Sequence, residues 1–158
     1  MNLKTTIKNG SQILRKNKIN SHELDSEILL SNILGVQREY LITNNNLDLS
    51  QDVIKKFNIA IKRRIKKEPI AYIVGKKEFW SNDFMVNKNT LVPRPETELL
   101  IYQLISYFKN KKINILDIGT GSGCILLSIL KELNFSRGIG IDISAKAIEM
   151  AEKNSNKL

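Results

Sequence analysis

Asp117-Ile118-Gly119-Thr120-Gly121-Ser122-Gly123 is the stretch that decides the fold. It directly follows residues 113–116, a mostly apolar run with the character of a buried parallel strand. The apolar residues 123–133 then suit a helix. A glycine-rich turn between a strand and a helix lets the backbone approach a ligand, and the start of the helix adds amide donors. The stretch therefore predicts a ligand-binding loop at the beginning of an α/β sheet.

The pattern continues with a second strand over residues 138–143 and a second helix over residues 145–154. Asp142 lies at the end of that strand, about 20 residues beyond the last glycine, where an acid can accept hydrogen bonds from ribose hydroxyls. The Gly-x-Gly-x-Gly spacing differs from the Gly-x-Gly-x-x-Gly of dinucleotide enzymes. A bare tight turn would explain the glycines but not the placement of Asp142.

This combination resembles the nucleotide-binding half of class I methyltransferases, which use S-adenosyl-L-methionine. The resemblance implies that the cofactor-binding residues are Gly119, Thr120, Gly121, Ser122, Gly123 and Asp142. Asp117 is a further candidate, although an acid at a strand end can simply cap loop amides. Cys124 opens the following helix, where the dipole could lower its pKa, but a small residue packing under the loop explains it better.

Residues 1–75 predict a small all-helical domain. Asn20 and Glu23 have the spacing of a capping box, with Gly35 as the left-handed stop of the helix that follows. Ser50 is a good N-cap for the next helix, which carries one apolar stripe.

Residues 76–94 predict a hairpin and linker, with two short strands at 78–80 and 84–86 around a turn at 81–83. Phe79 and Trp80 are expected in the hairpin core, whereas Phe84 is expected either there or facing a substrate pocket. Pro95 suits the first turn of a helix that runs to residue 108. The predicted fold class is thus α + α/β: a helical bundle, a hairpin, and the start of a Rossmann-like domain over residues 95–158.

Composition and charge narrow the class of protein further. The 158 residues are 42% hydrophobic and 26% charged, as in a globular protein. No stretch approaches the roughly 18 apolar residues of a membrane span, and the N-terminus lacks the pattern of a secretory signal. The one cysteine excludes an internal disulfide, and His22 has no acid or cysteine at ligand spacing, so no metal site is expected. We expect a cytoplasmic monomer.

The net charge of +9 leaves two interpretations open. The densest basic run, residues 62–67, could bind nucleic acid or lie on a solvated helix face. Lysine far outnumbers arginine in a chain also rich in asparagine and isoleucine, which favours the solvated face.

The segment Leu91-Val92-Pro93-Arg94-Pro95-Glu96-Thr97-Glu98 is more distinctive than the glycine turn. Together with Phe79-Trp80, with residues 68–75 and with residues 117–123, it is similar to the HemK/PrmC family of release factor glutamine methyltransferases. The similarity covers essentially the whole chain.

The resemblance implies transfer of a methyl group from S-adenosyl-L-methionine to a glutamine side-chain amide in the Gly-Gly-Gln motif of peptide chain release factors. By position, Thr97 would lie on the cofactor side, and Phe84, Arg94, Pro95 and Glu96 on the substrate side. Arg94 and Glu96 could equally tie the linker down.

The family's catalytic element is an Asn-Pro-Pro-Tyr loop, which orients the amide nitrogen. These 158 residues contain no such sequence, so no catalytic residue is expected within them. We therefore expect an inactive fragment, or a complete but degenerate protein. Three other functions stay open: glutamine methylation of a ribosomal protein, nitrogen methylation of a nucleic-acid base, and a helical RNA- or protein-binding module with a vestigial cofactor loop.

Overall fold

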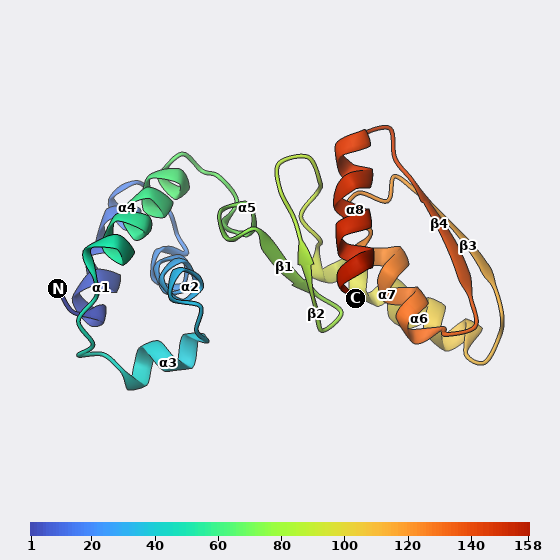
Figure 1. The fold of residues 1–158 in the computed structure, drawn as a ribbon, viewed down its shortest axis with the longest axis horizontal. Coiled ribbons are helices and arrows are strands. Elements are labelled where there is room, and N and C mark those ends of the chain that lie inside the picture. The colour runs from blue at the N-terminus through green and yellow to red at the C-terminus, as the bar shows by residue number, and fades with distance from the viewer. The chain divides into compact units, whose positions relative to one another are not determined.

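The structure, a computed structural model, describes residues 1–158 and divides into two compact units, Met1–Val74 and Gly75–Leu158 (Figure 1). The first unit is helical, with α1 (Leu3–Lys16), α2 (His22–Leu34), α3 (Arg38–Thr43), α4 (Gln51–Ile65) and α5 (Ile70–Val74). The second contains β1 (Lys76–Phe79), β2 (Asn82–Met85), the 3-10 turn η1 (Pro95–Thr97), α6 (Glu98–Phe108), β3 (Asn114–Ile118), α7 (Cys124–Glu132), β4 (Arg137–Ile141) and α8 (Ala145–Lys157). None of the helices is both long and apolar enough to cross a membrane.

Small residues let the helices of the first unit pack closely. A Cβ on Gly10 of α1 would lie only 2.5 Å from the ring of Phe57 in α4. Ser26 of α2 is completely buried and donates a hydrogen bond to the Ile7 carbonyl at 2.8 Å. The apolar core around them consists of Leu3, Leu14, Ile19, Leu29, Leu30, Leu41, Leu49, Phe57, Ala60 and Ile61.

The helix ends agree with two of the three predictions. Gly35 ends α2 with φ 69°, and the Ser50 hydroxyl caps α4 by accepting from the Val53 amide. The predicted capping box is wrong. The N-cap of α2 is Ser21, one residue after Asn20, and its hydroxyl donates to the Asp25 carboxylate instead of accepting from the first-turn amides.

The hairpin turns one residue earlier than predicted. Phe79 pairs with Asn82, so the turn is Trp80–Ser81, with φ values of 49° and 56°. Two residues with positive φ match the twist of the flanking strands, which explains the tighter turn. The Phe79 and Phe84 rings are both buried and meet edge to face, 6.1 Å between centroids.

β3 and β4 form a parallel pair, with Asp117 opposite Gly140. The structure confirms the fold class: helices are followed by a hairpin and by the first part of a Rossmann-like sheet. Gly138 and Gly140 bring β4 close to the elements above it, because a Cβ would meet Leu126 at 2.5 Å or Thr120 at 2.8 Å.

The opposite face of this sheet is apolar and uncovered. Its side chains are Leu116, Ile118, Ile139 and Ile141, which are 45–76% exposed, and Ile143 just beyond β4 is fully exposed. No element of these 158 residues packs on that face.

Candidate functional site

The glycine loop needs glycine for its backbone conformation. Gly119, Gly121 and Gly123 all have positive φ, at 80°, 58° and 78°. Other residues adopt this region only at a cost. Packing adds a second constraint at Gly123, where a Cβ would lie 3.0 Å from Leu127 and 3.2 Å from Ala151. The space beside Gly119 is open, so a ligand can approach the backbone there.

The carboxyl end of β4 holds the first half of the loop. The amides of Gly119 and Thr120 both donate to the Ile141 carbonyl, at 2.8 and 2.9 Å. The Gly121 amide donates to Asp142 Oδ2 at 3.0 Å. The acid predicted from its distance along the chain therefore lies against the loop.

The Asp142 carboxylate is held in its charged form. The Ser144 amide donates to Oδ1 at 2.9 Å, and this bond, followed by that from Gly121, lowers the pKa of Asp142. A carboxylate has about four lone-pair sites, so both oxygens can still accept hydrogen bonds from a ligand's hydroxyls.

Asp117 acts inside the loop. The Thr120 hydroxyl, in a side chain that is only 7% exposed, donates to Asp117 Oδ2 at 2.8 Å. Thr120 occupies the space that the missing Cβ of Gly140 leaves free. Two predicted site residues, Asp117 and Thr120, thus stabilise the conformation that the glycines permit.

Sequence reasoning missed Asn154 of α8. This side chain is completely buried; its Oδ1 accepts from the Met85 amide at 2.7 Å, and its Nδ2 donates to the carbonyls of Met85 and Ser122, at 3.0 and 2.8 Å. The available signal was an asparagine on the same buried helix face as Ala147 and Met150.

Cys124 is a packing residue. It is 9% exposed, and burial raises the pKa of its thiol despite its position at the start of α7. A protonated, buried thiol is a poor nucleophile.

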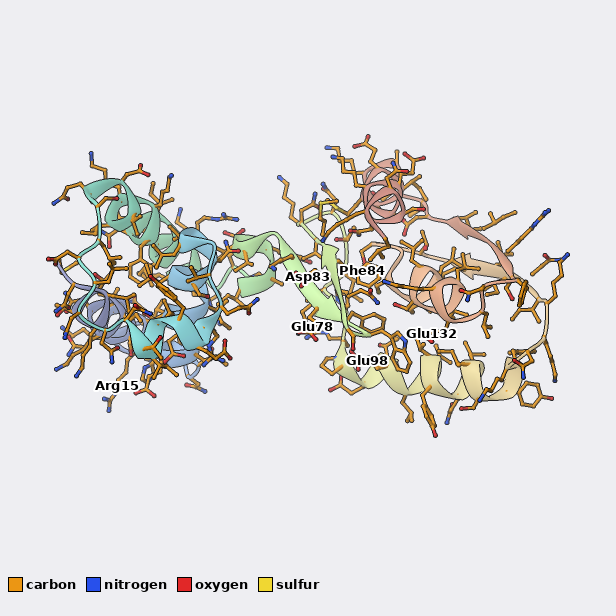
Figure 2. The ribbon with its side chains drawn as sticks, turned by 60° about the horizontal axis from the view of Figure 1, so that its bottom comes forward. Arg15, Glu78, Asp83, Phe84, Glu98 and Glu132 are labelled. Carbon is orange, nitrogen blue, oxygen red and sulfur yellow. The ribbon has the colours of Figure 1, made fainter.

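The residues expected near the substrate do not form one cluster. Phe84, labelled in Figure 2, is completely buried in the hairpin core, which is the first of the two positions expected for it. Arg94, Pro95 and Glu96 are exposed, and Thr97 is half-buried. No hydrogen bond or ion pair joins their side chains to the loop, nor do Arg94 and Glu96 form ion pairs that would tie down a linker.

Trp80 fastens the hairpin turn to the helices of its unit. Its backbone amide donates to Glu98 at 3.0 Å, and its indole nitrogen donates to Glu132 at 2.9 Å; Figure 2 labels both carboxylates. The hairpin therefore belongs to the same packed body as the glycine loop.

The basic run at residues 62–67 is largely engaged within the helical unit. Arg63 pairs with Glu68, whose pKa the guanidinium lowers, and Arg64 pairs with Asp25 at 2.6 Å in a mostly buried site. The Lys67 ammonium donates to two backbone carbonyls. These contacts favour a structural role for the run.

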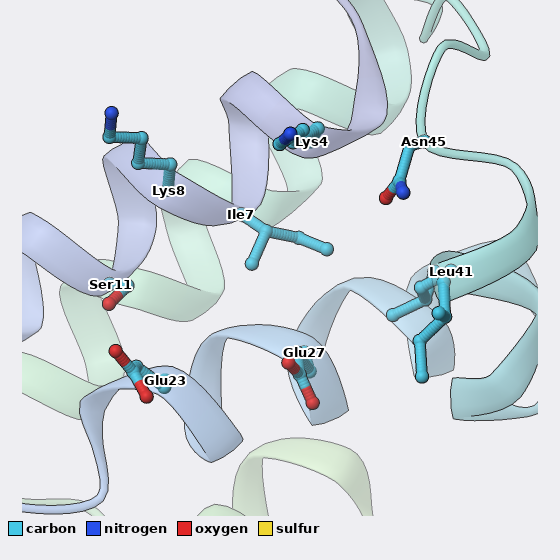
Figure 3. A pocket seen from close by; sticks show the side chains of 9 residues that line it. Lys4, Ile7, Lys8, Ser11, Glu23, Glu27, Leu41 and Asn45 are labelled. Carbon is cyan, nitrogen blue, oxygen red and sulfur yellow. The ribbon is translucent and has the colours of Figure 1, made fainter.

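The helical unit carries a pocket of about 380 Å³ between α1, α2 and α3 (Figure 3). Lys4 and Lys8 on α1 and Glu23 and Glu27 on α2 give its walls opposite charges. None of the predicted site residues lines it.

Two protein families match the chain. The family described as PrmC N-terminal domain matches residues 5–75, and that described as methyltransferase domain matches residues 109–158. The first match covers most of the helical unit, and the second contains the glycine loop and Asp142.

Individual relatives match across both units. A release factor glutamine methyltransferase of Buchnera aphidicola subsp. Baizongia pistaciae is 40% identical over 159 residues, covering 100% of this chain and 57% of the relative. That of Buchnera aphidicola subsp. Schizaphis graminum is 44% identical, over 85% of this chain and 49% of the relative. A bifunctional methyltransferase of Rickettsia typhi is 38% identical, over 98% of this chain and 34% of the relative. The chain spans about half the length of the release factor methyltransferases it matches.

Proposed function

The chain belongs to the family of the release factor glutamine methyltransferases, and on that basis we propose that it binds S-adenosyl-L-methionine at the glycine loop. The observation that carries the proposal is the contact between Asp142 and the loop. The carboxylate, kept ionised, accepts from the Gly121 amide, two residues from the open backbone at Gly119.

The roles of the residues follow from their chemistry. Gly119 to Gly123 leave room for the cofactor at the loop, and Asp142 accepts hydrogen bonds from its ribose hydroxyls. Asp117 and Thr120 stabilise the loop conformation through the hydrogen bond between their side chains. Bound there, the cofactor supplies a methyl group on a positively charged sulfur.

We further propose that the methyl acceptor is the side-chain amide nitrogen of glutamine in the Gly-Gly-Gln motif of a release factor. The names of the relatives and the Leu91–Glu98 segment support this substrate. On this proposal the exposed Arg94, Pro95 and Glu96 lie on the substrate side, and Thr97 lies between them and the cofactor.

The 158 residues alone are proposed to bind cofactor without transferring its methyl group, because they include no Asn-Pro-Pro-Tyr sequence to orient the amide. The purified chain, given labelled S-adenosyl-L-methionine and a release factor, should leave the factor unlabelled. Measurable methylation would overturn this part of the proposal.

Cofactor binding is tested by calorimetry with S-adenosylhomocysteine on the chain, on Gly121→Ala and on Asp142→Asn. Gly35→Ala is the matched control, because Gly35 also has positive φ and open space but lies in the helical unit. We expect the two site variants to lose at least about tenfold in affinity and the control to keep it. Equal binding by all four proteins would reject the assignment of the site. Salt-dependent RNA binding without cofactor binding would instead favour a binding module.

A further inference from the structure

The glycine loop is held from two sides. From β4, the Ile141 carbonyl and the Asp142 carboxylate accept the amides of Gly119, Thr120 and Gly121. From α8, the Asn154 amide group donates to the Ser122 carbonyl at 2.8 Å. The same peptide unit is fixed at its other end, since the Gly123 amide donates to the Thr120 carbonyl.

The orientation of the Asn154 amide is determined by its partners. Only its oxygen can accept from the Met85 N–H, and only its nitrogen can donate to two carbonyls. Both donor hydrogens are thus used, and the bond to the Ser122 carbonyl lies in a fully buried site, whereas Met85 is half-buried. Water cannot replace the bond to Ser122, so its loss leaves a buried carbonyl unpaired.

The other partner of Asn154 is the outer edge of the hairpin. Met85 of β2 gives the side chain both its N–H and its C=O, as it would give them to a neighbouring strand. Lys157, also on α8, donates to the Asp83 carbonyl at 2.7 Å. Asn154 alone extends this edge contact to the glycine loop.

We propose that Asn154 is a positioning residue for cofactor binding: it couples the order of the β1–β2 hairpin to the shape of the glycine loop. The nature of the ligand rests on the function proposed above, whereas the effect on loop order does not. A loop already fixed in its binding conformation loses less entropy when the ligand binds.

The test compares Asn154→Asp, which keeps an acceptor for Met85 but removes both donors, with Asn156→Asp on the exposed side of α8. The two variants share the substitution, the helix and the charge change. Hydrogen exchange of the amides at residues 119–125 is measured without ligand, and S-adenosylhomocysteine affinity is measured by calorimetry. Lys157→Ala removes the edge contact that does not reach the loop.

Asn154→Asp should exchange its loop amides about tenfold faster than Asn156→Asp, and bind the ligand about tenfold more weakly. Lys157→Ala should change neither quantity by more than about twofold. Loop exchange and affinity equal to those of Asn156→Asp would overturn the proposal.

If Asn154→Asp does not fold, hydrogen exchange of the unaltered chain with and without ligand tests the coupling instead. Ligand binding should slow exchange at the Met85 amide as well as in the loop, and protection of the loop alone would refute the coupling. If the unaltered chain binds no S-adenosylhomocysteine, the proposed function fails, and ligand-free exchange still shows whether Asn154 orders the loop.

Discussion

Alanine at Gly140 should disturb the glycine loop, whereas alanine at Gly138 should not. Both glycines lie on β4, on the face that packs against the rest of the unit. A Cβ at residue 140 would lie 2.8 Å from Thr120 Oγ1 and 3.0 Å from its Cβ. At residue 138 it would lie even closer to its neighbour, 2.5 Å from Leu126 Cδ1.

The two neighbours differ in their ability to move. The Leu126 methyl is the end of a flexible side chain, which can rotate away. Thr120 is β-branched, buried and bonded to Asp117, so its displacement loses a hydrogen bond worth about 1 kcal/mol and adds overpacking of about 1–2 kcal/mol. Alanine also lowers the conformational entropy of the unfolded chain relative to glycine, which offsets about 0.5 kcal/mol of the loss in stability in either variant. We expect a net loss of about 2 kcal/mol for Gly140→Ala and under about 1 kcal/mol for Gly138→Ala.

Urea unfolding followed by the fluorescence of Trp80, the one tryptophan of the chain, reports on this unit. Gly140→Ala should lower the midpoint with an unchanged slope and weaken S-adenosylhomocysteine binding, while Gly138→Ala should leave binding intact. A larger loss of stability in Gly138→Ala would refute the reasoning, because contact distance alone would then decide.

Three further predictions concern ionisable groups. Because the folded state lowers the pKa of Asp142, its contribution to stability is present above the unfolded value of about 3.9 and is lost as pH falls through the lower folded value. Cofactor affinity should therefore stay flat as pH falls from neutral to the unfolded value and decrease only below it. Titration calorimetry of Asp142→Asn should lack that decrease. Because burial raises the pKa of Cys124, a thiol reagent should label it at pH 8 only after unfolding, and rapid labelling of the folded chain would contradict its assignment as a packing residue. Arg64→Met leaves Asp25 buried without its cation and should lower the free energy of unfolding, measured by circular dichroism, by about 3 kcal/mol. The double variant with Asp25→Asn should recover most of that loss, and no recovery would show that packing, not charge, was lost.

The glycine loop was predictable because its requirements are local. Positive φ at Gly121 and Gly123 follows from the tight turn between a strand and a helix, and Asp142 follows from the length of one βαβ unit. The fold class was predictable for the same reason, since each helix and strand carries its own periodicity.

The errors and omissions came from side-chain contacts that local spacing does not determine. The Asn20 capping box is plausible locally, but the Ser21 hydroxyl bonds Asp25, which also pairs with Arg64 of another helix. The sequence left two positions open for Phe84, because only its edge-to-face contact with Phe79 on the neighbouring strand places it in the hairpin core. Asn154 contacts residues 32 and 69 positions earlier in the chain, and no spacing rule connects them.

The sealing of the β2 edge by α8 has a consequence for biosynthesis. Met85 is synthesised 69 residues before its partner Asn154, which at about 5–20 residues per second is a delay of several seconds. During that interval the nascent hairpin presents an unpaired strand edge, the part of a sheet most prone to pairing with another chain. Until α8 has been synthesised, the hairpin is therefore a site at which this polypeptide can pair with another chain.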